Sequence, residues 1–157
     1  MRVEVPLLRP AQFHPMAAGE VAVYRSEGYV FTVYLPGPAG SAVAEAAPSA
    51  PASAVHPVDP AAAARFWVAY AWPAERDRGG RRAFYIDQDD RICQTDNAQG
   101  YSGSERIPAA NAALGTAPGA APCSGPTGDG GSWRTWKKKR PRGPQDPLQK
   151  DSSAPKE

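Results

Sequence analysis

The sequence is poor in large aliphatic residues and has no long apolar run. Leu, Ile, Val and Phe make up only 22 of the 157 residues, whereas Ala, Gly and Pro make up 62. So low an apolar content predicts a small folded core with long irregular surroundings. No stretch of about 18 apolar residues occurs, which predicts no membrane-spanning helix. The first 20 residues contain charged side chains and three prolines, and they lack the apolar core of a secretory signal.

The sequence has few histidines, and its potential metal ligands do not occur at the spacing of a known metal site. The two histidines, His14 and His56, are far apart, and neither stands at ligand spacing with a cysteine. The acidic stretch 87–96 does not match the ligand positions of an EF-hand calcium loop, so a solvated turn is favoured over a looser calcium site made of loop oxygens. The Ser- and Gly-rich stretches 100–104 and 125–132 lack the context of a nucleophile elbow or a phosphate-binding loop. The sequence therefore predicts no catalytic residue, no metal site, no cofactor and no small-molecule substrate.

Only two cysteines are present, Cys93 and Cys123. A bridge between them would close a loop of about 30 residues and add about 3–4 kcal/mol in an oxidising compartment. Two free thiols, with Cys93 buried inside a strand, fit the sequence equally well. The sequence leaves both alternatives open.

Lysine is absent from the first 132 residues, and all five lysines lie in the last 25. Residues 1–132 carry a net charge of −3, and residues 133–157 carry +5. This shift in composition predicts a basic, disordered tail from residue 133 onward. Aromatic and basic side chains that neighbour one another there are candidates to contact nucleic acid or another anionic surface. These candidates are Trp133, Trp136, Lys137, Lys138, Lys139 and Arg140, although a simple solvated tail is favoured over dedicated nucleic-acid binding.

Five segments have the β-branched and aromatic composition of strands: 21–25, 29–35, 66–72, 82–87 and 91–95. Short polar turns separate the first two and the last two, as in hairpins. The fold class predicted is mainly β, a small antiparallel meander of four or five strands with long irregular loops. Frequent prolines argue against a helix bundle.

Composition also divides the chain into four parts. Residues 1–20 are predicted to form an irregular lead-in, and residues 21–105 a β-sheet domain with a mobile loop at 37–60. A linker rich in Gly, Ala and Pro follows at 106–132, and the basic tail occupies 133–157.

Alternation along the strands indicates which side chains pack. In 29–35, the odd-numbered residues share one face and the even-numbered residues the other. In 66–72, Phe66, Val68, Tyr70 and Trp72 alternate with Trp67 and two alanines, and the small alanines suggest close packing against another element. The predicted packing residues are Tyr29, Phe31, Phe66, Trp67, Tyr70, Trp72, Phe84 and Ile86.

Several short motifs within residues 6–105 resemble one family. They are a Gly-Tyr strand at Gly28-Tyr29, a turn at Trp72-Pro73-Ala74-Glu75, and a hairpin carrying Arg82–Asp87, Ile92, Thr95 and Asp96. Together with a Pro-Leu-Leu lead-in at 6–8, they resemble the soluble head of type IV pilin-like proteins and type II secretion pseudopilins. The resemblance departs from the family at Asp90, where the pattern usually has Gly, and in lacking the family's N-terminal helix and cleavage motif.

The resemblance implies a non-enzymatic structural or assembly protein, linked to a surface filament or a secretion apparatus. Its partner would be a protein that supplies a helix, or other pilin-like subunits, and its location would be periplasmic or cell-surface if a longer gene supplies the helix. A sheet face meant for that helix would be bare, and Phe66, Val68, Tyr70, Phe31 and Val33 are predicted to form an exposed apolar patch. The alternative is a small binding module that uses the Trp- and Lys-rich tail, and the weakest hypothesis is an enzyme site built from Asp87, Asp89 and Arg91.

Overall fold

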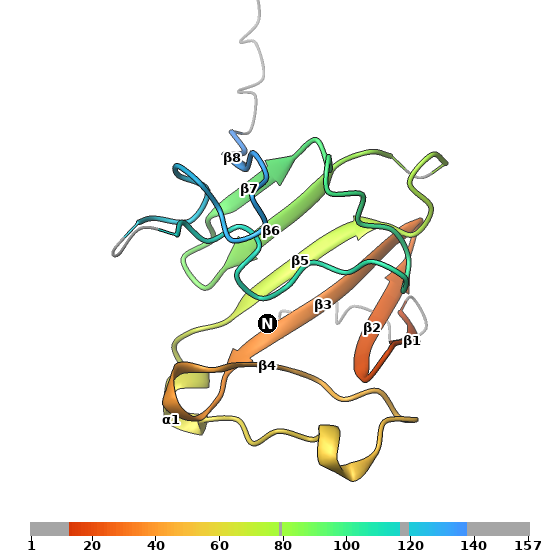
Figure 1. The fold of residues 1–157 in the computed structure, drawn as a ribbon, viewed down its shortest axis with the longest axis vertical. Helices are drawn as coiled ribbons and strands as arrows, with labels where there is room; N and C mark the ends of the chain where they lie inside the picture. Colours follow the sequence, from red (N-terminus) through yellow and green to blue (C-terminus); the bar gives the residue numbers. More distant parts are fainter. Residues whose placement is uncertain (1–12, 79, 117–119, 138–157) are drawn as a thin grey trace, which may run out of the picture.

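A computed structural model describes residues 13–78, 80–116 and 120–137, and these form one antiparallel β-sheet (Figure 1). The strands are β1 (His14–Ala18), β2 (Val21–Ser26), β3 (Tyr29–Pro36), β4 (Ala42–Ala44), β5 (Val68–Pro73), β6 (Ala83–Asp87), β7 (Ile92–Thr95) and β8 (Arg134–Thr135). Their order across the sheet is β1-β2-β3-β5-β6-β7-β8, and β4 pairs with β3. Helix is limited to α1 (Pro60–Ala63) and to 3-10 turns at Pro38–Gly40 and Ala52–Ala54. The mainly β, antiparallel prediction is confirmed, with more strands than the four or five expected.

Two tight hairpins set the register of the meander. Between β2 and β3, Glu27 and Gly28 both have positive φ, the turn geometry that matches the twist of an antiparallel pair. Between β6 and β7, the buried Asp87 carboxylate accepts hydrogen bonds from the backbone N–H groups of Asp89 (3.0 Å) and Arg91 (3.2 Å). That arrangement is an Asx-type turn, in which a side chain replaces a missing backbone acceptor.

The long connection between β3 and β5 is more structured than the loop predicted for 37–60. β4 pairs with the end of β3, and the backbone then returns to β2 through the hydrogen bond from Ala22 N–H to Glu45 O (2.7 Å). Val43 and Ala47 are buried there. Composition alone does not predict this structure, because alanine packs closely without producing a distinctive pattern of apolar residues.

The two faces of the sheet differ sharply. One face, called the covered face, carries the even-numbered residues of β3 and the residues opposite them on the neighbouring strands. Its principal side chains, all buried, are Val30, Thr32, Tyr34, Tyr70, Trp72, Tyr85 and Cys93. The alternation predicted for 29–35 is therefore observed, since burial in β3 alternates along the strand.

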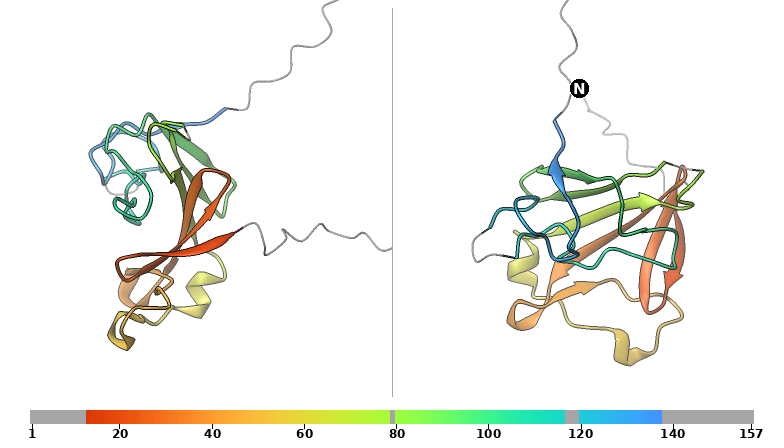
Figure 2. Two further views of the ribbon diagram at one scale, coloured as in Figure 1. Left: turned by 90° about the vertical axis from the view of Figure 1, so that its right-hand side faces the viewer. Right: turned by 45° about the horizontal axis from the view of Figure 1, so that its top comes forward.

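An irregular segment of the same chain, residues 97–116 and 120–133, covers this face (Figure 2). The polar ends of three aromatic side chains hold it in place. Tyr34 Oη donates to Pro108 O (2.7 Å), Tyr70 Oη to Ala110 O (2.9 Å) and Trp72 Nε1 to Gly103 O (2.8 Å). An irregular backbone needs such partners, because its carbonyls have no ladder to join.

This covering segment includes most of what composition describes as a linker at 106–132. Ala112 and Ala113 are fully buried in the core, and Trp133 also packs into it. The difference has a plain cause: the covering segment contributes small side chains and backbone to the core, while the large aromatic rings come from the sheet. Apolar content alone therefore underestimates its packing.

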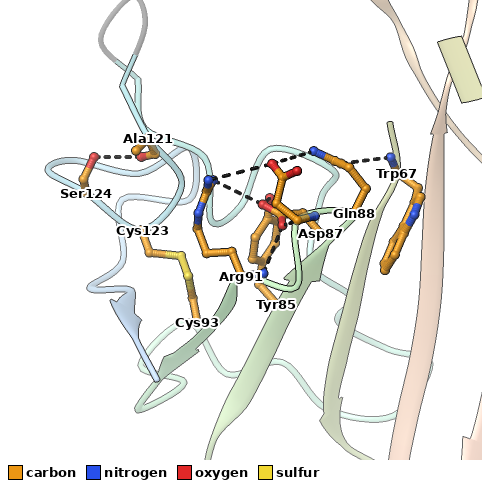
Figure 3. A network of polar contacts seen from close by, with 10 residues as sticks. Trp67, Tyr85, Asp87, Gln88, Arg91, Cys93, Ala121, Cys123 and Ser124 are labelled. Carbon is orange, nitrogen blue, oxygen red and sulfur yellow. Dashed lines mark hydrogen bonds and ion pairs between the residues drawn. A yellow bond between two sulfur atoms is a disulfide. The ribbon is translucent and has the colours of Figure 1, made fainter. Parts of the chain in front are cut away.

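A disulfide between Cys93 and Cys123 joins β7 to the covering segment (Figure 3). Of the two alternatives that the sequence left open, the structure has the bridge. A second tie is Asp129, whose carboxylate accepts from Trp133 Nε1 (3.0 Å), Tyr101 Oη (2.7 Å) and Gly131 N–H (2.7 Å). The disulfide and this carboxylate connect otherwise irregular backbone to the sheet.

The ends of the described chain also differ from expectation. β1 occupies part of the predicted lead-in, where it pairs with β2 along its whole length. β8 occupies the start of the predicted tail, where it pairs with β7. Residues 1–12 of the predicted lead-in and 138–157 of the predicted tail lie outside the described residues.

Candidate functional site

The face opposite the covering segment is apolar and is called here the open face. Strand alternation and register place its residues on one side, because cross-strand partners point the same way. Phe31 lies opposite Ala71, which in turn lies opposite Phe84, and Val33, Ala69, Ile86 and Ile92 form a second row. The open face consists of Phe31 and Val33 of β3, Ala69 and Ala71 of β5, Phe84 and Ile86 of β6, and Ile92 of β7.

A groove of about 230 Å³ runs over the centre of this face. Its floor is formed by Ala69 and Ala71, and the larger side chains of Phe31, Phe84 and Ile86 form its walls. No charged side chain lines it. The alternation of bulky and small residues along β5 thus puts large rings on the covered face and leaves a shallow apolar channel on the open face.

Exposure separates the two faces. Tyr70 on the covered face is 1% exposed, whereas Val33 on the open face is 48% exposed. The other residues of the open face are half-buried. Ring contacts extend along the open face, since Phe13 packs edge-on against Phe31 (5.9 Å between centroids) and Tyr29 packs against Phe84 (6.0 Å). An antiparallel sheet with one covered face ordinarily presents polar side chains on the other, whereas the centre of this face is apolar and polar residues such as Gln94 and Tyr24 lie toward its edges.

The predicted packing residues divide between the two faces. Tyr70 and Trp72 are buried on the covered face, while Tyr29, Phe31, Phe84 and Ile86 are half-buried on the open face. Trp67 is half-buried just before β5, where its N–H donates to Gln88 Oε1 (3.3 Å).

Phe66 does not pack in the core, since it is 52% exposed and lies beneath the Arg65 guanidinium, 5.9 Å from the ring centroid. The reason is local: the turn after α1 precedes β5, so the alternation begins at Val68 and not at Phe66. The predicted patch of Phe66, Val68, Tyr70, Phe31 and Val33 is therefore wrong as a single surface, because Tyr70 is buried on the face opposite Phe31.

Residues proposed to contact an anionic partner are also separated. Trp133 is buried and donates to Asp129, which makes it a core residue. Trp136 is 38% exposed, and Lys137 is exposed. Lys138, Lys139 and Arg140 lie outside the described residues.

Asp87, Asp89 and Arg91 come together at the β6–β7 turn, where Arg91 forms ion pairs with Asp87 (3.2 Å) and Asp89 (3.9 Å). Figure 3 shows Asp87 and Arg91, whose contacts hold the turn together. The Asp87 carboxylate accepts from Tyr85 Oη (3.1 Å) and from Arg91 Nη1 (3.2 Å), in addition to the two turn N–H groups. Burial raises the pKa of the Tyr85 hydroxyl, and the neighbouring Asp87 raises it further. A neutral tyrosine that donates to a buried carboxylate stabilises the turn.

Sequence reasoning missed Tyr85, Tyr101 and Asp129. The signal for Tyr85 was present, because alternation within 83–87 places it on the same face as Tyr70. No such signal exists for Tyr101 and Asp129. These two residues form a hydrogen bond with each other, but they are 28 residues apart in the sequence and lie in segments without a regular pattern.

Two further cavities lie beside the sheet. One of about 400 Å³ lies between β2, β3 and β4. Aliphatic side chains form most of its lining, and His56 and Glu45 also line it. Another of about 520 Å³ lies near the β6–β7 turn and includes Phe66 and Arg91. Within residues 13–78, 80–116 and 120–137, no group of three or more His, Cys, Asp or Glu side chains is placed to hold a metal ion.

None of the helices in the described part of the chain is long and apolar enough to cross a membrane. In comparisons with known proteins, no family model, no curated protein and no solved structure matches this chain.

Proposed function

We propose that this chain is the β-sheet head of a non-enzymatic structural or assembly protein, and that its open face receives an α-helix supplied by a protein partner. The observation that carries the proposal is the contrast between the faces. The chain's own residues cover one face with 97–116 and 120–133, while the other carries an apolar groove with no charged lining. A contiguous, partly exposed apolar patch of this kind is typical of an interaction surface.

The shape of the groove supports a helix as the occupant. Its walls stand on β3 and β6, the two strands that flank β5. Two inter-strand spacings separate these walls by about 10 Å. A helix with its side chains is about 10–12 Å across. Ala69 and Ala71 leave room between the walls for side chains of the incoming helix.

The finer proposal is that the chain belongs to a pilin-like or pseudopilin-like assembly, part of a surface filament or a secretion apparatus. Its support is the sequence resemblance together with an antiparallel sheet that has one apolar face. On this proposal the protein works in the periplasm or at the cell surface, and the Cys93–Cys123 bridge suits that oxidising setting.

Sedimentation velocity of the full chain across a range of concentrations tests the docking face. In the absence of its partner, the wild-type protein should self-associate through the open face as concentration rises. The variant Ala71→Glu, which puts a charge on the groove floor, should remain monomeric. The matched control Phe66→Glu alters an exposed aromatic residue outside the groove and should behave like the wild type. A compact wild-type monomer at every concentration would overturn the proposal.

A further inference from the structure

The sheet opens between β2 and β3 a short way from their hairpin. The pairing of β2 with β3 ends at Phe31, and the pairing of β4 with the same edge of β3 begins only at Tyr34. The two residues between them, Thr32 and Val33, pair with β5 on the other edge but with no strand of the described chain on this one. The cavity of about 400 Å³ lies at this opening, and both residues line it.

The connection from β4 to β5 closes the cavity on its other sides. Next to β4, Ala22 N–H donates to Glu45 O (2.7 Å), which holds the chain after β4 against β2. Further along, Asp59 N–H donates to Pro36 O (2.9 Å), which holds residues 55–58 near the end of β3. Figure 1 shows this connection as the orange-to-yellow chain at the bottom of the view. Backbone hydrogen bonds therefore fix both parts of the connection that line the cavity.

Exposed aliphatic side chains gather around this cavity. Val33 (48% exposed), Val55 (65%) and Val58 (36%) are the exposed large aliphatic residues of the described chain, and all three line it. Exposed aliphatic residues ordinarily lie singly on a protein surface, so a cluster around one cavity indicates a site for an apolar group. The volume lies in the range of about 300–1,000 Å³ that is usual for small-molecule sites.

The charged group in the lining is a carboxylate. Glu45 is exposed and therefore lies at the mouth of the cavity, whereas Ala22 and Val43 are buried at its inner end. Tyr24 Oη donates a hydrogen bond to Glu45 Oε2 and orients the carboxylate. This hydrogen bond raises the pKa of Tyr24, and burial raises it further, so the tyrosine remains a donor.

No cation balances this carboxylate in the part of the chain that the structure describes. Lysine and arginine are absent from the described lining, and none of the described ion pairs includes Glu45. His56 adds a further hydrogen-bonding side chain to the lining. The cavity is therefore apolar inside and negative at its mouth.

We propose that this cavity binds a small amine, whose ammonium group pairs with Glu45 and whose apolar body packs among Val33, Val55 and Val58. An ionised carboxylate has about four acceptor sites, so it accepts from an ammonium group while it accepts from Tyr24. An anionic ligand would be repelled by the same charge. Tyr24 and Glu45 are 21 residues apart in the sequence, and the fold brings them together. This inference goes beyond the proposed function, since it requires no partner helix.

Four small probes test the ligand class on the full, oxidised chain: butylamine, hexylamine, hexanol and hexanoate. Titrations followed by amide proton–nitrogen NMR spectra measure both the affinity and the place of binding. Hexylamine should bind about tenfold more tightly than hexanol, because a charged hydrogen bond replaces a neutral one, and hexanoate should bind most weakly. Each methylene added to butylamine should tighten binding by up to about fourfold, because it removes apolar surface from water.

Variants assign the affinity to its residues. Glu45→Gln should reduce the affinity for hexylamine to about that for hexanol and leave hexanol unchanged. The matched control Glu105→Gln removes an exposed carboxylate outside the lining and should leave both affinities unchanged. The combined substitution Val55→Ala and Val58→Ala changes exposed residues outside the strands and should weaken both probes by a similar factor.

The NMR signals that shift locate the ligand. Shifts should be largest at residues 43–46 and 55–58, whereas shifts centred on Phe84 and Ile86 would place the probe on the open face and overturn the inference. Hexanoate that bound as tightly as hexylamine, or an unchanged hexylamine affinity in Glu45→Gln, would overturn the choice of an amine.

Two further results would overturn the site itself. One is the absence of saturable binding by every probe. The other is a blocked lysine-containing peptide that bound at least tenfold more tightly than butylamine, since the cavity would then be a peptide-docking surface. None of these results decides whether the open face receives a helix, which sedimentation of the Ala71→Glu variant tests separately.

Discussion

In the described part of the covering segment, the Asp129 carboxylate accepts more hydrogen bonds than any other side chain. Burial opposes its ionisation, but hydrogen bonds from Trp133, Tyr101, Gly131 and Thr127 outweigh burial and lower its pKa. We expect Asp129→Asn to reduce the free energy of unfolding by about 1–2 kcal/mol, because hydrogen bonds to a charged acceptor are lost. Urea denaturation measures this change in the free energy of unfolding, and the substitution Asp77→Asn at an exposed position serves as the control.

The same pKa shift gives this contribution a pH dependence. Asp129 has a lower pKa in the folded chain than in the unfolded one, where aspartate titrates near 3.9. Its stabilisation is present above that value and is lost as the pH falls through the folded pKa. The difference between the wild type and Asp129→Asn should therefore shrink below about pH 4. A difference that stays constant with acidification would show that the carboxylate charge is not what stabilises the segment.

Asp90 occupies a backbone conformation that favours glycine. Its φ is 56°, in the left-handed region, at the β6–β7 turn. The pilin-like family that the sequence resembles usually has Gly at this position. Asp90→Gly should leave the fold unchanged and raise the free energy of unfolding by up to about 1 kcal/mol, because the strain of a Cβ at positive φ is removed. Asp89→Gly, where φ is not positive, should destabilise or have no effect. Thermal denaturation of both variants tests this, and equal shifts would contradict it.

At the scale of elements, the Cys93–Cys123 bridge ties the covering segment to β7. Replacing both cysteines with alanine should cost about 3–4 kcal/mol, since the bridge closes a loop of 30 residues. Hydrogen exchange should then rise first at residues 101–116, because the sheet keeps its own ladder. The wild type in reducing buffer should behave like the double variant. Uniform loss of protection across the sheet would contradict this order.

Whether the sequence predicts a strand or segment depends on the type of side chain that this element contributes to the core. β3, β6 and β7 were predictable because β-branched and aromatic residues alternate along them. β1, β4 and the covering segment were not, since alanine, glycine, proline and serine pack through backbone and small side chains that leave no periodic signal. The open face was predictable only in part: Phe31, Phe84 and Ile86 were identified, but the burial of Tyr70 on the opposite face depends on Ala110, Ala113 and Trp133, which are remote in sequence.

For the whole molecule, the core consists of aromatic rings that contact one another across the covered face. Tyr70 stands at the centre, in edge-on contact with Tyr34 (6.1 Å), Tyr85 (5.5 Å) and Trp133 (5.9 Å). Rings on the sheet supply the volume and the covering segment supplies small side chains and carbonyl acceptors. A chain with few aliphatic residues can therefore fold around tyrosine, on the condition that each hydroxyl keeps its partner.

That condition makes the whole fold sensitive to alkali. Burial raises the pKa of Tyr70, Tyr85 and Tyr101 well above the ordinary value of 10. Because the unfolded chain ionises these tyrosines first, their contribution to stability is complete below about pH 10 and is lost as the pH rises toward the folded values. Urea midpoints should therefore fall steeply above pH 10.

Phenolate absorbance provides the matching measurement on the six tyrosines of the chain. In the folded protein only part of the phenolate signal should titrate with a midpoint near pH 10, and the rest should appear at higher pH, together with unfolding. In the urea-denatured protein, the control, the whole signal should titrate with a midpoint near pH 10. If the folded protein showed the same single titration as the control, the buried hydroxyls would be reachable by solvent, and an aromatic core sealed by residues 97–116 and 120–133 would be ruled out.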